Sequence, residues 1–238
     1  MKKIALITGA TSGIGQATAL KAAEAGFEII ITGRREDRLQ QLAAEIRQKG
    51  SEVLSLCFDV RDAEAVKKAI ENLDDKWKNI AVLVNNAGLA VGVSPLQEGI
   101  LDDWERMIDT NVKGLLYVTR AVAPLMIQKN SGHIVNIASI AGKEVYPGGN
   151  VYCATKHAVD ALSRAMRTDM LKHNIKVTNI APGMVETEFS LVRYKGDAAA
   201  AKNVYKGMTP LTNEDIADTI LFAITRPAHV CLNDIVIM

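Results

Sequence analysis

The sequence has little of what marks the more specialised classes of protein. Its three cysteines, Cys57, Cys153 and Cys231, stand far apart, a spacing that fits neither a disulfide scaffold nor a cysteine metal site. The four histidines are also scattered without ligand spacing, so no metal is expected. The 28 basic residues are offset by 27 acidic ones, which is not the basic surplus of a nucleic-acid-binding protein. We therefore expect a reduced, cytoplasmic protein without a nucleic-acid partner.

Long hydrophobic runs are missing as well. The apolar stretches, such as residues 134–138, have the length of strands, whereas a membrane helix needs about 20 apolar residues. Two lysines precede the first apolar run, but the run breaks at Thr8 and Gly9 without the cleavage site of a secretion signal. Linkers rich in glycine, serine or proline do not occur either. The sequence therefore predicts one domain over residues 1–238, with no membrane partner.

Short apolar runs alternate with segments of helical periodicity. The apolar residues Leu39, Leu42, Ala43 and Ile46, for example, share one helical face. Nearly continuous apolar runs are typical of strands buried on both faces. The seven runs cover residues 4–8, 29–32, 53–58, 80–84, 133–137, 176–180 and 235–238. This alternation predicts an α/β fold, a Rossmann-type, doubly wound parallel sheet of about seven strands with helices on both faces.

One region interrupts the alternation. Between Pro182 and Pro210 no strand is expected, and polar residues mix with glycine and alanine. Because ligands bind beyond the carboxyl ends of parallel strands, we expect an irregular segment near 184–210 that covers the substrate. Thr212 to Asp215 then has the pattern that begins a final helix.

A glycine-rich turn follows the first expected strand. Residues 8–15 read Thr-Gly-Ala-Thr-Ser-Gly-Ile-Gly, and a helix is expected from Ile14 onward. Glycines allow a tight turn and close approach of a pyrophosphate, and the N-terminus of a helix favours an anion. This position between strand and helix indicates dinucleotide binding rather than a turn that needs glycine for geometry alone. The expected contacts are Gly9, Thr11, Ser12, Gly13, Ile14 and Gly15.

The second expected strand ends in arginines where an acidic residue normally binds the ribose 2′-hydroxyl of NAD. Arg34 and Arg35 stand at this position. A guanidinium group suits a phosphate because its N–H groups donate in pairs and its charge is permanent. The alternative is that both arginines coat the start of a helix and pair with Glu36 and Asp37. Their position favours NADP as the cofactor, with both arginines as ligands of its 2′-phosphate.

A serine, a tyrosine and a lysine form the candidate catalytic set. Ser139 follows the fifth strand, and Tyr152 and Lys156 lie four residues apart on one side of the next helix. Oxidation of an alcohol needs a base, but free tyrosine has a pKa of about 10. A lysine ammonium one turn away, with a cationic nicotinamide, would lower that pKa. A tyrosine and a lysine at this spacing are by themselves a chance pair; with the glycine turn and Ser139 they predict hydride-transfer chemistry.

Together these motifs resemble those of the short-chain dehydrogenase/reductase family. The resemblance also rests on Asn-Asn-Ala-Gly at 85–88, on Asp59 with Val60, and on Asn111. It implies that Tyr152 is the acid/base, that Ser139 orients the substrate, and that Asn111 supports a water-linked proton relay through Lys156. Lys156 would also bind the ribose and lower the tyrosine pKa. The further cofactor contacts it implies are Asp59, Val60, Asn86, Ala87, Gly88, Tyr152, Lys156, Pro182, Gly183, Val185 and Thr187.

Longer stretches are similar to the bacterial NADP-dependent 3-hydroxy acid dehydrogenases, including those acting on serine or allo-threonine. They cover residues 85–91, 104–111, 146–152, 187–197 and 227–230. This resemblance implies hydride transfer between NADP and a small 3-hydroxy or 3-keto acid. A carboxylate near the reacting carbon needs a cation, and the segment after Pro182 offers Arg193 and Lys195. We expect substrate contacts from Ser139, Tyr146 and Arg193; the alternative places both cations on the outer face of the segment.

Two other functions stay open at this point. A 3-oxoacyl-(acyl carrier protein) reductase shares the same serine, tyrosine, lysine and asparagine, and a net charge of +1 neither favours nor excludes an acidic carrier. A nucleotide-sensing regulator with this fold would have no need of the proton relay. The resemblance further implies a homotetramer that packs through the helices around Asn111 and Lys156. Relatives commonly continue in a short tail beyond the last strand, where this sequence has Met238.

Overall fold

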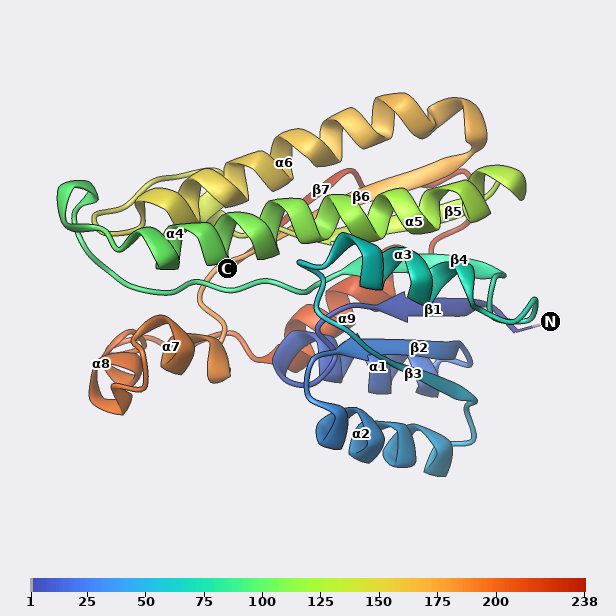
Figure 1. Ribbon diagram of the computed structural model, residues 1–238, viewed down its shortest axis with the longest axis horizontal. Helices are drawn as coiled ribbons and strands as arrows, with labels where there is room; N and C mark the ends of the chain where they lie inside the picture. The colour runs from blue at the N-terminus through green and yellow to red at the C-terminus, as the bar shows by residue number, and fades with distance from the viewer. Residues whose placement is uncertain (1) are drawn as a thin grey trace.

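The computed structural model describes residues 2–238, and its seven strands form a single parallel sheet (Figure 1). The strand order is β3-β2-β1-β4-β5-β6-β7. The strands are β1 (Ile4–Ile7), β2 (Glu28–Gly33), β3 (Val53–Cys57), β4 (Ile80–Asn85), β5 (Gly132–Ile137), β6 (Ile175–Pro182) and β7 (Asp234–Ile237). All seven predicted strands are present, and the predicted doubly wound sheet is confirmed. The order of strands reverses between β1 and β4, which is where such sheets bind ligands.

Helices cover both faces of the sheet. On one face, α1 (Gly13–Glu24), α2 (Glu36–Gln48) and α9 (Asn213–Ile224) pack their apolar sides against the strands. On the other face lie α3 (Ala63–Glu71), α5 (Leu115–Gln128) and α6 (Asn150–Met170). The strands β1 to β6 therefore contribute side chains to two cores, which explains why they read as continuous apolar runs rather than alternating ones.

A smaller apolar cluster lies beyond the main cores. It includes Leu89, Met107 and Tyr152, and Trp104 and Phe189 pack against it. Trp104 and Met107 come from α4 (Leu101–Ile108), which continues through the π-helical turn η2 (Asp109–Gly114) into α5. The segments that follow β4 and β5 are therefore packed around a separate small apolar core.

The segment between β6 and α9 contains two short helices, α7 (Glu188–Arg193) and α8 (Ala198–Asn203), which lie together beside the sheet (Figure 1). The sequence pattern predicts an irregular segment here, whereas the structure has two helices. Helices of six residues are too short to show a period of 3.6 residues, so periodicity misses them. The base of the segment is held by backbone hydrogen bonds at Leu211, which donates to Met184 (2.9 Å) and accepts from Glu186 (2.8 Å).

The start of the final helix agrees with its sequence signal. Thr212 is the N-cap of α9, and it forms a capping box with Asp215. A separate observation concerns membranes: within residues 2–238, every helix is too short or too polar to cross a bilayer.

Candidate active site

A cleft of about 350 Å³ opens along the carboxyl ends of the strands. Most of the residues predicted to bind the cofactor or substrate line it, although they come from six different strand ends. They are Gly9, Thr11, Ser12, Gly13, Ile14, Arg34, Arg35, Asp59, Val60, Asn86, Ala87, Gly88, Ser139, Tyr152, Lys156, Pro182, Gly183, Val185 and Thr187. The predicted residues Gly15, Asn111, Tyr146 and Arg193 are not among the cleft-lining residues.

Other cleft-lining residues were missed by the sequence analysis. They are Gly33, Phe58, Leu89, Arg106, Thr110, Ile137, Ala138, Glu188, Phe189 and Val192. Many of them adjoin a predicted site residue in the chain, so proximity to the motifs was the available signal. Arg106 had no such signal, because only the packing of its helix brings it to the cleft.

The glycine-rich turn after β1 is shaped to admit an anion. Gly9 has a φ of +64°, and a Cβ there would lie 2.9 Å from Cα of Ala87. A Cβ on Gly15 would lie 2.5 Å from both Nδ2 of Asn86 and the carbonyl oxygen of Gly9. Gly15 is therefore needed for close packing of α1 on the turn rather than for lining the cleft. Ser12 is the N-cap of α1 but its side chain makes no capping bond, so the first N–H groups of the helix suit an anionic ligand.

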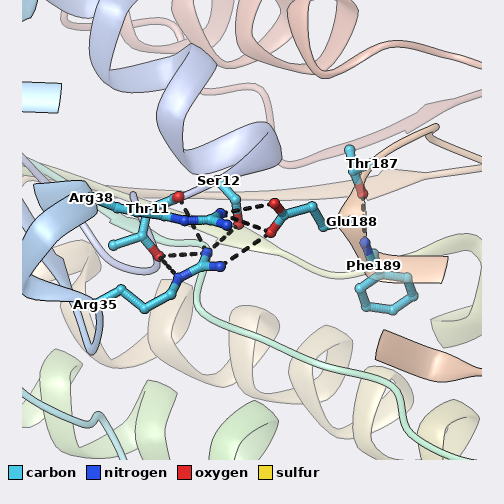
Figure 2. Close-up of polar contacts among 7 residues, drawn as sticks. All are labelled: Thr11, Ser12, Arg35, Arg38, Thr187, Glu188 and Phe189. Carbon is cyan, nitrogen blue, oxygen red and sulfur yellow. Dashed lines mark hydrogen bonds and ion pairs between the residues drawn. The ribbon is translucent and has the colours of Figure 1, made fainter. Parts of the chain in front are cut away.

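The arginines after β2 are placed beside this turn. Nε and Nη2 of Arg35 donate to Oγ1 of Thr11 (3.2 and 2.9 Å), and Nη2 also donates to Oγ of Ser12 (2.9 Å), as Figure 2 shows. The side chain of Arg34 is 61% exposed, and its nearest acidic partner is Asp59 at 3.6 Å. Within the described residues, Arg34 pairs with Asp59 and Arg35 with Glu188, rather than with Glu36 or Asp37. Two guanidinium groups beside a phosphate-binding turn fit the 2′-phosphate of NADP.

A third arginine and an acidic residue join this region. Arg38 on α2 donates from Nη1 to both carboxylate oxygens of Glu188 (2.8 and 3.0 Å), and Arg35 donates to the same carboxylate (3.2 Å; Figure 2). Hydrogen bonds from Arg38 and Arg35 hold the pKa of the Glu188 carboxyl below its usual value. No local sequence pattern connects these residues, because 150 positions separate Arg38 from Glu188.

Asparagine and aspartate side chains stabilise the strand ends around the cleft. Nδ2 of Asn86 donates to the carbonyl oxygens of Thr8 (2.9 Å) and Gly9 (3.2 Å), which ties the end of β4 to the glycine turn. Burial acts to raise the pKa of Asp59, but hydrogen bonds from Arg61 outweigh it and hold that pKa below its usual value. A carboxylate in this state can orient neighbouring N–H groups at neutral pH.

The predicted catalytic residues come together at the other end of the cleft. Tyr152 and Lys156 lie on α6 and are 9% and 6% exposed. Nζ of Lys156 donates to the carbonyl oxygen of Ile137 (2.8 Å) and lies 5.9 Å from the centre of the Tyr152 ring. Ser139 lies two residues beyond the end of β5, and its Oγ accepts from the backbone N–H of Ala141 (3.1 Å). The end of β5 thus places the serine and holds the lysine.

Burial dominates the ionisation of this group. Burial raises the pKa of the Tyr152 phenol, while a hydrogen bond with Ser139 and the charge of Arg193 act to lower it. Burial also lowers the pKa of Lys156 to about 8. Burial is the largest influence on the pKa of Tyr152. That Lys156, together with a cationic nicotinamide, lowers this pKa stays a prediction. At neutral pH the tyrosine is protonated and able to donate a proton.

Asn111 sits in the π-helical turn between α4 and α5. Its side chain is 2% exposed, accepts from the N–H of Leu89 (2.8 Å), and donates to the carbonyl of Leu89 (2.8 Å) and to Oγ1 of Thr155 (3.0 Å). A Cβ on Gly88 would lie 3.3 Å from Oδ1 of Asn111 and 3.6 Å from Nζ of Lys156. The absence of a side chain at Gly88 thus lets the asparagine and the lysine approach each other. Single π-helical turns frequently occur at functional sites.

The helix α7 brings two side chains close to Tyr152, the predicted acid/base. The Phe189 ring lies 5.7 Å from the Tyr152 ring, centre to centre. The guanidinium carbon of Arg193 lies 5.1 Å from the centre of the Tyr146 ring and 5.9 Å from that of Tyr152. Nε of Arg193 is buried and has no hydrogen-bond partner within residues 2–238. A buried guanidinium N–H without an acceptor is a ready site for a carboxylate.

Lys195 is used differently from Arg193. Its ammonium forms an ion pair with the buried carboxylate of Asp103 (2.7 Å). Of the two cations that the sequence offered, Arg193 is thus the one still able to bind an anion. No group of three or more histidine, cysteine or acidic residues arranged to hold a metal ion occurs in the part of the chain that the structure describes.

Comparison with known proteins identifies the class. Residues 3–196 match the family model described as short chain dehydrogenase. The chain therefore belongs to the short-chain dehydrogenase family, as its motifs predicted.

Individual relatives cover almost the whole chain. It is 48% identical to the NADP-dependent 3-hydroxy acid dehydrogenase YdfG of Salmonella typhi, over 99% of this chain and 94% of that one. It is 47% identical to sulfoacetaldehyde reductase 2 of Chromohalobacter salexigens, over 100% of this chain and 94% of that one. Among solved structures, the closed form of a serine dehydrogenase complexed with NADP⁺ matches with a TM-score of 0.94 and 45% identity, over 99% and 94% of the two chains.

Proposed function

We propose that this protein is an NADP-dependent oxidoreductase that interconverts a small 3-hydroxy acid, such as serine or allo-threonine, and the corresponding 3-keto acid. The observation that carries the proposal is the arrangement of one cleft. Ser139, Tyr152 and Lys156 lie at one end, and Arg34 and Arg35 lie beside the phosphate-binding turn at the other. When bound, the cofactor would supply hydride to the carbonyl carbon as NADPH or accept it from the alcohol carbon as NADP⁺.

The proton chemistry belongs to the chain's own residues. In the reducing direction the phenol of Tyr152 donates its proton to the substrate oxygen, and in the oxidising direction its phenolate takes that proton back. The hydroxyl of Ser139 holds the same oxygen by a hydrogen bond. The ammonium of Lys156, with a pKa of about 8, stabilises negative charge on the tyrosine. Asn111 holds the Leu89 backbone and Thr155 in place beside this lysine.

NADP is favoured over NAD by the groups at the end of β2. Gly33, Arg34 and Arg35 stand there without the carboxylate that would bind a free ribose 2′-hydroxyl. Among the relatives, YdfG is named NADP-dependent and the serine dehydrogenase was solved with NADP⁺. The remaining predicted cofactor residues are proposed to contact the adenine, ribose, pyrophosphate and nicotinamide along the cleft.

The substrate class is an acid because of Arg193. Its guanidinium lies over Tyr152, and its buried Nε has no acceptor among the described residues. A carboxylate bound there would place a carbon two bonds away near the phenol of Tyr152. Tyr146, stacked on the same guanidinium, completes the proposed substrate contacts. The relatives named for serine, for 3-hydroxy acids and for sulfoacetaldehyde all take their names from small acids.

Other functions for this cleft differ from the proposed one in the substrate or in the absence of chemistry. A sulfonate would satisfy Arg193 as a carboxylate does, so reduction of sulfoacetaldehyde is the second candidate activity, and 47% identity to a sulfoacetaldehyde reductase favours testing it. The acyl carrier protein reductase is not favoured by these relatives. A regulator without chemistry is not favoured either, since Ser139, Tyr152 and Lys156 all line the cleft.

The experiment follows absorbance of the reduced nicotinamide. Purified protein with NADP is offered L-serine, D-serine, L-allo-threonine, 3-hydroxybutyrate and 3-hydroxyisobutyrate, and NADPH formation is measured. Formation with one or more of them, lost in Tyr152→Phe, supports the proposal and narrows the substrate. Silence of the whole panel, with NADPH consumed on sulfoacetaldehyde or on an acetoacetyl thioester, contradicts it in favour of the corresponding alternative.

We also propose a cytoplasmic homotetramer. Large apolar side chains on α4 and α5 are exposed, including Leu101 (68%), Ile108 (41%) and Leu116 (37%). All three cysteines are free, as expected in a reducing compartment. Light scattering of the purified protein tests the assembly, with a mass of four 25.7 kDa chains expected.

A further inference from the structure

The carboxylate of Glu188 lies between two guanidinium groups at the adenosine end of the cleft. It accepts from Nη1 of Arg35 at 3.2 Å and from Nη1 of Arg38 at 2.8 and 3.0 Å (Figure 2). Glu188 is the first residue of α7, whereas Arg38 lies on α2 and Arg35 is the N-cap of α2. The contact therefore joins the segment over the substrate to the element that follows β2, where the 2′-phosphate is expected.

The hydrogen bonds of Arg35 leave little capacity for a further anion. Nε and Nη2 donate to Thr11 and Ser12, and Nη1 donates to Glu188. All three guanidinium nitrogens thus have an acceptor within the described residues. A phosphate that approached Arg35 would have to replace one of these acceptors. Of the three, only the Glu188 carboxylate is negatively charged and would repel the phosphate. Arg38 is in the same position, because its Nη1 donates to both oxygens of Glu188.

The Glu188 side chain also stays negatively charged at neutral pH. Hydrogen bonds from the two arginines hold the pKa of its carboxyl below the usual value, so it stays ionised at neutral pH and cannot yield by taking up a proton. Its side chain is 49% exposed, and those of Arg35 and Arg38 are each 40% exposed. Ion pairs exposed to this extent are weak enough for a dianion to displace one of the partners.

We propose that Glu188 is a cofactor-selectivity residue, an internal anion that competes with the 2′-phosphate of NADP for Arg35 and Arg38. It weakens binding of phosphorylated adenosine ribose and leaves binding of the unphosphorylated form unchanged, so it reduces the preference for NADP over NAD. Arg34, which is more exposed and lies 3.6 Å from its nearest carboxylate, is not engaged by Glu188. This inference rests on the proposed use of NADP.

The test measures binding rather than turnover. Calorimetry gives the Kd of 2′,5′-ADP and of 5′-AMP, which differ by the 2′-phosphate, for the wild-type protein and for Glu188→Gln. Glutamine keeps the shape of the side chain and removes the charge. We expect 2′,5′-ADP to bind about threefold to tenfold more tightly to the variant, the range that one or two exposed ion pairs account for. The Kd of 5′-AMP stays the same, and the gain shrinks as salt is added.

Glu186→Gln is the matched control. Glu186 is two residues away, exposed, and forms no ion pair with another described residue, so its change alters the net charge equally without touching the arginines. An equal gain in Glu186→Gln would overturn the proposal, because it would show a general charge effect. Unchanged or weaker 2′,5′-ADP binding in Glu188→Gln would also overturn it and would make Glu188 a positioning residue for the arginines.

The wild-type protein separates this inference from the cofactor proposal. If wild type binds 2′,5′-ADP and 5′-AMP equally, the proposed use of NADP fails and the role of Glu188 fails with it. If wild type prefers 2′,5′-ADP and Glu188→Gln leaves that preference unaltered, only the role of Glu188 fails. Thermal melting of each variant confirms that it is folded before its Kd is compared.

Discussion

The guanidinium carbon of Arg193 lies 5.9 Å from the centre of the Tyr152 ring, although the two residues belong to α7 and α6. Backbone contact supports this placement, since the carbonyl of Arg193 accepts from the N–H of Gly92 (2.9 Å). Tyr152, the proposed acid/base, and Arg193, the proposed carboxylate ligand, are therefore close enough to contact the same small substrate. Because α7 carries the arginine, the position of that segment decides whether an acid can be held for reaction.

Arg193→Ala tests this relationship. We expect kcat/KM for 3-hydroxy acids to fall about 30-fold or more, since a buried charge pair typically contributes this much, while activity on uncharged alcohols is kept. Arg193→Lys should recover part of the loss. Lys202→Ala, an exposed cation on α8, is the control and should behave like wild type. Equal loss on acids and uncharged alcohols would dismiss Arg193 as the anchor.

Tyr152→Phe tests the proton transfer. Removing the phenol hydroxyl should lower kcat by about 10²- to 10⁴-fold, the usual contribution of general acid–base catalysis. NADP binding, measured by calorimetry, should be retained, because the phenyl ring still packs against Phe189. A variant that keeps more than a tenth of wild-type kcat would show that another group moves the proton.

The raised pKa of Tyr152 predicts opposite pH dependences for the two directions of reaction. Burial keeps the phenol protonated at neutral pH, so reduction, which needs the acid form, proceeds at neutral pH and declines in alkali. Oxidation needs the phenolate and therefore speeds up as the pH rises above neutrality. Initial rates in both directions from pH 6 to 10 check this. An oxidation rate that is flat across that range would be incompatible with tyrosine as the base.

Arg35→Asp tests the choice of cofactor. The carboxylate would stand where a 2′-phosphate is proposed to bind, so the KM for NADPH should rise at least tenfold, and that for NADH should change much less. Arg47→Gln, at the far end of α2 and exposed, serves as the control. If the ratio of the two KM values does not move, Arg35 is not a phosphate ligand.

His133 predicts a loss of stability in acid. Burial lowers its pKa to about 3 from an ordinary 6.5, and its Nε2 shares a hydrogen bond with Thr178 (2.8 Å). Between these pH values His133 binds a proton in the unfolded chain but stays neutral in the folded protein. The stability present above pH 6.5 is therefore lost as the pH falls. Between pH 7 and 5 this amounts to about 2 kcal/mol. Urea unfolding at both values measures it. His133→Asn, even if less stable throughout, should show a smaller difference between pH 7 and pH 5; an undiminished difference would assign the acid sensitivity to other groups.

The fold and the family could be predicted from the sequence because their signals are local. Strands buried on both faces read as continuous apolar runs, and helices between them show a 3.6-residue period. The glycine turn, Ser139, Tyr152 and Lys156 are recognisable because their spacing follows from one turn or one helix. The predicted ends of the strands agree with the structure within two residues, and the capping box at Thr212 marks the start of α9.

What the sequence by itself determined, then, is that seven strands alternate with helices in a doubly wound parallel sheet, and which residues are proposed to carry the chemistry. Only the tertiary structure decided which charges meet. Pairs such as Glu188 with Arg38 or Lys195 with Asp103 join distant parts of the chain, and no local pattern records them. It also decided that burial raises the pKa of Tyr152 despite its hydrogen bond with Ser139, because burial depends on everything that packs around a group and not on its neighbours in sequence.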